Sequence, residues 1–160
     1  MKQILSFTLN GLTVEALAKP TDTLLDLLRE QVGVTGPKRG CDSGDCGACM
    51  VLLDGQPVNA CLVIALTVTG REVTTVEGLG HPAKLHPLQE AFHEHGASQC
   101  GFCSSGMIIS AKALLDRNPK PTRDEIKEAL SGNLCRCGSY IEVIEAIEAV
   151  SAGKRKEGQP

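Results

Sequence analysis

Eight cysteines, arranged as two sets of four with none left over, constrain this 160-residue chain more than any other feature. The first set is Cys41, Cys46, Cys49 and Cys61, and the second is Cys100, Cys103, Cys135 and Cys137. Residues 1–10 lack the long apolar core and the cleavage site of a secretory signal. Cysteines in a chain without such a signal favour metal or redox chemistry over disulfides. We therefore expect a cytoplasmic protein with two metal centres.

The first set has the spacing C-x4-C-x2-C with a fourth cysteine further on, which is the plant-type ligand pattern for a 2Fe–2S cluster. The loop from Gly40 to Cys49 is rich in glycine and other small residues. Glycine lets backbone N–H groups approach an anionic cluster closely. The loop chemistry and the spacing both predict a 2Fe–2S cluster here.

The second set has the spacing C-x2-C, a long interval, and then C-x-C. Each pair precedes a predicted helix, so the positive ends of two helix dipoles would face a bound cluster. Two short cysteine pairs also suit tetrahedral zinc. Spacing alone therefore leaves zinc open as an alternative, more so at the second site than at the first.

Hydrophobic periodicity predicts an α+β first half and a helical second half. Alternating apolar residues on both sides of Asn10-Gly11 predict a hairpin, because both residues tolerate positive φ. The remaining predicted elements are a helix at 24–32, strands at 50–53, 57–61 and 68–76, and helices at 88–95, 107–117, 123–130 and 140–150. Residues 80–85 form the predicted linker. We expect domains at residues 1–79 and 80–160, the second ending in a short tail.

Charge and hydropathy argue against several other functions. A formal net charge of −3 gives no basic footprint for nucleic acid. The longest apolar run, residues 61–66, is far shorter than the roughly 20 residues that span a bilayer. No Ser–His–Asp arrangement, phosphate-binding loop or carboxylate pair stands out, so we expect no catalytic residue in this chain.

With both cysteine sets in view, the chain resembles the iron–sulfur subunit of the xanthine oxidase family of molybdenum hydroxylases, over about residues 3–150. Three stretches carry the resemblance: residues 40–49, Gln99-Cys100-Gly101-Phe102-Cys103 and Gly132-Asn133-Leu134-Cys135-Arg136-Cys137. The resemblance implies an N-terminal β-grasp, ferredoxin-like domain and a C-terminal four-helix-bundle domain. It also implies that each cysteine set holds a 2Fe–2S cluster. Gln99 and Cys137 would contact a molybdopterin, in a dinucleotide form, that another subunit holds.

The same resemblance implies a role in electron transfer. The chain would relay single electrons between a molybdopterin site in a large subunit, on one side, and an FAD-binding medium subunit or external acceptor on the other. The expected assembly is a heterotrimer or a dimer of heterotrimers. The competing interpretations are a free-standing two-cluster ferredoxin and a zinc-binding interaction module.

Two departures from the family pattern stand beside the second cysteine set. Ser104-Ser105-Gly106 replaces a common Thr-Pro-Gly, and we expect a serine to cap the helix that begins there. Gly138-Ser139-Tyr140 replaces a common Thr-Gly-Tyr, which changes the loop that the resemblance places beside the pterin.

Overall fold

The computed structural model describes residues 1–153 and confirms the α+β class. The strands are β1 (Gln3–Leu9), β2 (Leu12–Ala18), β3 (Met50–Leu53), β4 (Gln56–Asn59) and β5 (Glu72–Thr74). The α-helices are α1 (Leu24–Asp26), α2 (Pro87–Glu94), α3 (Ser104–Arg117), α4 (Arg123–Ala129) and α5 (Tyr140–Ser151). The end of the predicted C-terminal tail, residues 154–160, lies outside the described residues. Within residues 1–153, no helix has the length and apolar character needed to cross a bilayer.

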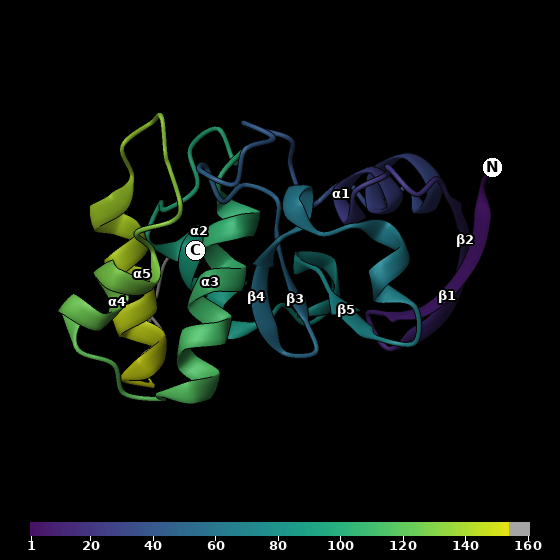
Figure 1. The fold of residues 1–160 in the computed structure, drawn as a ribbon. Helices are drawn as coiled ribbons and strands as arrows, with labels where there is room; N and C mark the ends of the chain where they lie inside the picture. Colours follow the sequence, from purple (N-terminus) through teal and green to yellow (C-terminus); the bar gives the residue numbers. More distant parts are fainter. Residues whose placement is uncertain (154–160) are drawn as a thin grey trace.

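The five strands form one mixed sheet in the order β2-β1-β5-β3-β4 (Figure 1). The predicted hairpin is confirmed: β1 and β2 pair antiparallel, with Leu9 opposite Leu12. Asn10 and Gly11 turn the chain with φ of 51° and 82°, as a type I′ turn requires. β1 pairs parallel with β5, and β5 pairs antiparallel with β3.

One helical segment crosses the sheet where a helix was predicted at 24–32. It begins at Thr23, whose hydroxyl accepts the N–H of Asp26 while the Asp26 carboxylate accepts the N–H of Thr23. The segment is α-helical only as α1 and then widens into a π-helix at Leu27–Val32. The N–H of Gly33 bonds to the carbonyl of Leu28, five residues back, which is the π pattern. Four leucines of this segment are fully buried against the sheet: Leu24, Leu25, Leu27 and Leu28.

Two predicted strands are shorter than expected. The predicted strand at 57–61 ends at Asn59, because the 3-10 turn Ala60–Leu62 follows and carries Cys61. Of the predicted strand at 68–76, only β5 is extended. A 3-10 turn at Ala65–Val68 and a left-handed Gly70, with φ of 73°, interrupt the β-branched run.

Helices α2 to α5 enclose a second hydrophobic core (Figure 1). The four predicted helices are found with every boundary within three residues of the prediction, and the capping box of Thr122 with Glu125 is confirmed. The spacing of Ile141 and Ile144 predicts one apolar face on α5, and for Ile141 this is wrong, since 61% of its surface is exposed. At 100° per residue, Ile141 lies outside the arc of Val143, Ile144 and Ile147, which face the core.

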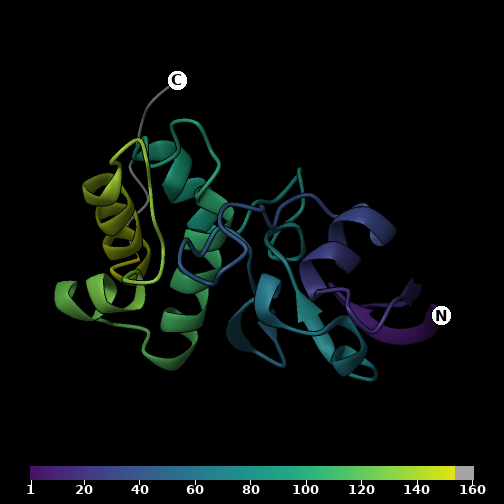
Figure 2. The same ribbon diagram turned by 45° about the horizontal axis from the view of Figure 1, so that its top comes forward.

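The sheet half and the helical half meet along α3, which packs against β3 (Figure 1). Leu52 from β3 and Ile109 and Ala113 from α3 form a small buried cluster there. The loop before β3 reaches across to the N-terminal end of α3, as the turned view shows (Figure 2). A Cβ on Gly106 would lie 2.1 Å from the carbonyl oxygen of Gly47, so the two backbones are in direct contact.

Candidate metal centres

The first cysteine set lies on the loop before β3 and on the 3-10 turn after β4. The Sγ of Cys41 accepts N–H bonds from Ser43 and Cys46, each at 3.4 Å. A Cβ on Gly40 would lie 2.6 Å from the Sγ of Cys46, so a larger residue at this position would displace that sulfur. Asp42 has a φ of 57°, which turns the loop back over its own thiols. The loop is therefore wound so that its amides point at sulfur.

Burial and hydrogen bonds give the thiols of the first set very different pKa values. Hydrogen bonds from Ser43, together with the N–H of Cys46, lower the pKa of Cys41 to about 6. Burial, with the neighbouring thiol of Cys61, raises the pKa of Cys49 to about 12. Cys41 is exposed, whereas Cys49 and Cys61 are buried. The set therefore has one end at the surface and one end in the interior.

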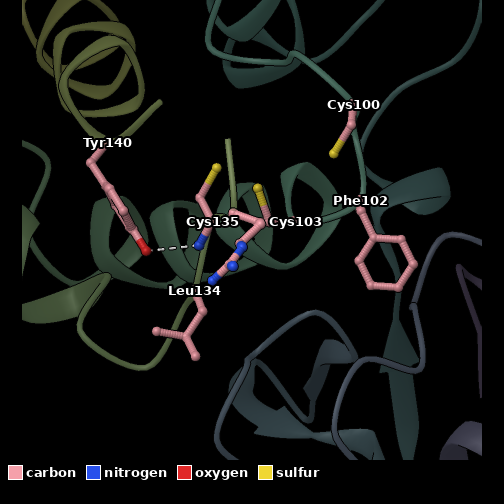
Figure 3. A pocket seen from close by; sticks show the side chains of 7 residues that line it. Cys100, Phe102, Cys103, Leu134, Cys135 and Tyr140 are labelled. Atoms are coloured by element: carbon pink, nitrogen blue, oxygen red, sulfur yellow. Dashed lines mark hydrogen bonds between the residues drawn. The ribbon is translucent and has the colours of Figure 1, made fainter. Parts of the chain in front are cut away.

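The second set surrounds the N-terminal ends of two helices, as predicted. Cys103 is the N-cap of α3, and Cys135 and Cys137 stand just before α5. The hydroxyl of Tyr140 accepts the N–H of Cys135 at 2.7 Å and closes the loop between them (Figure 3). A cavity of about 580 Å³ opens there, lined by Cys100, Phe102, Cys103, Leu134, Cys135, Arg136 and Tyr140.

The thiols of the second set also differ widely in pKa. Burial, reinforced by the adjacent Cys135, raises the pKa of Cys103 to about 12. Burial would also raise the pKa of Cys135, but hydrogen bonds from Ser139 and neighbouring groups hold it at about 7. Cys100 and Cys137 are exposed. This set likewise runs from the interior to the surface.

The donor chemistry fits a 2Fe–2S cluster in each set. Within each set the thiols lie close enough to shift one another's pKa values: Cys46 neighbours Cys41 and Cys49, Cys49 also neighbours Cys61, and Cys135 neighbours Cys100, Cys103 and Cys137. A 2Fe–2S cluster with four cysteine ligands has two irons, and each iron takes two thiolates. Among residues 1–153, no three His, Cys, Asp or Glu side chains are arranged to hold a single ion. Buried thiols with a pKa near 12 become ligands only if a cation stabilises the thiolate.

A backbone hydrogen bond joins the two sets. The N–H of Leu134 donates to the carbonyl oxygen of Cys46 at 2.9 Å. The buried side chain of Asn133 supports this contact, because its amide donates to the carbonyl of Gly47 at 3.2 Å and its oxygen accepts the hydroxyl of Ser110 at 2.7 Å. Leu134 is bonded directly to Cys135, so one hydrogen bond completes a path from one set to the other.

Sequence reasoning named the eight cysteines and Gln99 but missed the residues that join and support them. Gln99 is exposed and lies next to Cys100 at the surface end of the second set. Asn133 lies within the matching stretch 132–137, but a single buried asparagine gives no periodic signal. The predicted serine cap of α3 is wrong: Cys103 takes the N-cap position, and the hydroxyl of Ser104 pairs with Ser98.

Comparison with known proteins identifies two iron–sulfur domains in this chain. Residues 7–79 match the family model of a 2Fe-2S iron-sulfur cluster binding domain, and residues 75–148 match that of a 2Fe-2S binding domain. One of the subunits of nicotinate dehydrogenase from Pseudomonas putida is 45% identical over 98% of this chain and 99% of its own length. The nicotinate dehydrogenase small FeS subunit of Eubacterium barkeri is 47% identical over 91% of this chain and 93% of its own.

The chain belongs to the iron–sulfur subunits of the xanthine oxidase family of molybdenum hydroxylases. A solved structure extends the match: a chain of quinoline 2-oxidoreductase from Pseudomonas putida 86 superposes with a TM-score of 0.91. It is 45% identical, and the match covers 98% of each chain. As an iron–sulfur subunit, this chain transfers electrons within a multi-subunit oxidoreductase. It is not a free-standing ferredoxin.

Proposed function

We propose that the two cysteine sets each hold one 2Fe–2S cluster. Cys41, Cys46, Cys49 and Cys61 bind the first, and Cys100, Cys103, Cys135 and Cys137 bind the second. The amides that point at Cys41 and the hydroxyl and amides around Cys135 stabilise the anionic ligands. Residues 1–79 act as a β-grasp ferredoxin-like domain, and residues 80–160 act as a four-helix-bundle domain with a short tail.

The relay role rests on one observation, the hydrogen bond between Leu134 and Cys46. Each set has exposed cysteines at one end, Cys41 in the first and Cys100 and Cys137 in the second. The bond connects the sets at Cys46 and, through Leu134, at Cys135. The chain thus offers a route between the exposed cysteines of one set and those of the other, across the contact between its two halves.

The bound clusters supply one-electron chemistry, so two of them divide a two-electron oxidation or reduction into single steps. Gln99 and Cys137 contact the molybdopterin, in a dinucleotide form, of the large partner subunit. A side-chain amide suits this position because it both donates and accepts hydrogen bonds. The exposed end at Cys41 faces an FAD-binding subunit or an external acceptor. The assembly is a heterotrimer or a dimer of such heterotrimers.

Metal analysis of the natural complex tests this proposal. The complex is purified anaerobically through a tag on this chain, and iron, molybdenum and zinc are measured per chain. We expect about four irons, because each 2Fe–2S cluster contributes two, together with molybdenum and a larger polypeptide. Zinc in place of iron would overturn the ligand assignment, and four irons without molybdenum or a larger polypeptide would overturn the relay.

Paired cysteine variants test the assignment to two sets. Cys49→Ala and Cys103→Ala each remove a buried thiol, one from each set. Each variant should retain about two irons per chain and lose one of two electron paramagnetic resonance (EPR) signals, a different one in each case. Each variant serves as the control for the other. Loss of the same signal in both would contradict the division into sets.

Gln99→Ala tests the pterin contact. Gln99 is exposed and is not one of the proposed cluster ligands, so both EPR signals should stay. Molybdenum retention after gel filtration should fall. Unchanged molybdenum content and unchanged turnover would remove Gln99 from the cofactor contact.

A further inference from the structure

Ser139 is buried, with 2% of its surface exposed, and its hydroxyl lies 3.4 Å from the Sγ of Cys135. It is the N-cap residue of α5, where a serine hydroxyl normally accepts an N–H from the first helical turn. The side chain of Ser139 makes no such capping bond. The hydroxyl of Ser139 therefore forms its hydrogen bond with the sulfur of Cys135 and does not cap the helix.

The direction of this hydrogen bond follows from the state of the ligand. A thiolate that binds iron has no proton, so the hydroxyl of Ser139 must donate and the sulfur must accept. The N–H of Cys135 is already bonded to Tyr140, which leaves the loop closed around the sulfur.

We propose that the hydroxyl of Ser139 raises the reduction potential of the second cluster by donating a hydrogen bond to Cys135. A reduced cluster carries one more negative charge than an oxidised one, and part of that charge lies on the ligand sulfurs. A donor therefore stabilises the reduced form more than the oxidised form. This inference rests on the proposed function, since it takes Cys135 as a ligand of the second cluster.

A redox titration of the purified complex, followed by EPR, tests the role of Ser139. In Ser139→Ala the second cluster should become harder to reduce, by about tenfold in its equilibrium constant, which is about 59 mV for one electron. The potential of the first cluster should not change. Ser139→Thr keeps the hydroxyl and should retain the original potential. Ser104→Ala is the matched control, because that hydroxyl pairs with Ser98 beside the same cysteine set.

The outcomes separate this inference from the proposed function. Iron content and two EPR signals in the unmodified complex test the ligand assignment and are independent of Ser139. Equal potentials in Ser139→Ala and the unmodified complex would overturn the inference. A shift in Ser139→Thr as large as in Ser139→Ala would assign the effect to packing and would also overturn it. Loss of the second cluster in both variants would make Ser139 structural and would likewise overturn it.

Discussion

Gly106 gives the sharpest test of how the two halves are held together. A Cβ there would lie 2.1 Å from the carbonyl oxygen of Gly47 and 3.3 Å from the Cα of Ala48. Ordinary carbon–oxygen contacts start at about 3.3 Å, so Gly106→Ala requires a shift of roughly 1 Å. The obstructing atoms are backbone and cannot move aside as a flexible side chain would.

Two effects of opposite sign decide the outcome of Gly106→Ala. Alanine is favoured over glycine by about 1 kcal/mol in a helix interior, and by no more than this in the first turn, where Gly106 lies. Overpacking costs about 1–3 kcal/mol, and losing the hydrogen bond from Asn133 to Gly47 costs about 1 kcal/mol more. We expect a net loss of about 1–3 kcal/mol, because the clash and the broken bond together exceed the helix propensity.

Urea unfolding, followed by circular dichroism, measures the effect of Gly106→Ala. The midpoint should fall while the slope stays the same, since the unfolded surface does not change. Gly132→Ala is the control: it lies in the facing loop, and a Cβ there meets no atom within 4 Å. Its midpoint should stay close to that of the original chain. A Gly106→Ala chain as stable as the original, or more stable, would refute the argument that the backbone contact limits this position.

Three further substitutions have predictable costs in the same assay. Asn133→Leu removes the bonds to Gly47 and Ser110 and should cost about 1–3 kcal/mol, because the Gly47 carbonyl still accepts the N–H of Met50; an unchanged midpoint would show that these two bonds add nothing to stability. Thr122→Ala removes half of the capping box of α4 and should cost about 1 kcal/mol, with no change in iron content. Arg39→Ala breaks exposed ion pairs with Asp26 and Asp42 and should cost less than about 1 kcal/mol, and a larger loss would point to a structural role for Arg39.

The sequence predicted those parts of the fold that local patterns determine. The turn of the hairpin requires positive φ, which Asn10 and Gly11 both tolerate, so this pair predicted the hairpin. The capping box of Thr122 and Glu125 predicted the start of α4. The strand predicted at 68–76 was too long because β-branched residues resemble a strand whether or not a partner is available. There the chain turns at Gly70, and only Glu72–Thr74 find partners in the sheet.

The cysteine spacing predicted which residues form each set, but it carried no information about how the sets are joined. The bond from Leu134 to Cys46 uses only backbone atoms, and any residue except proline could donate it. The sequence marks Ser139 only as part of an altered loop, because the one-dimensional pattern does not show that its hydroxyl turns toward Cys135. The sequence therefore predicts the residues of each cysteine set from their local spacing, but it does not predict the contacts between distant segments.

The contact between the halves also links stability to the connection between the cysteine sets. Gly47, which touches Gly106, is the next residue after Cys46, and Asn133, which binds Gly47, is the residue before Leu134. A change that moves α3 away from this loop therefore acts on Asn133, which binds both Gly47 and Ser110 of α3 and is the residue next to Leu134. Because these contacts share neighbouring backbone atoms, the halves cannot separate while the path between the sets stays intact.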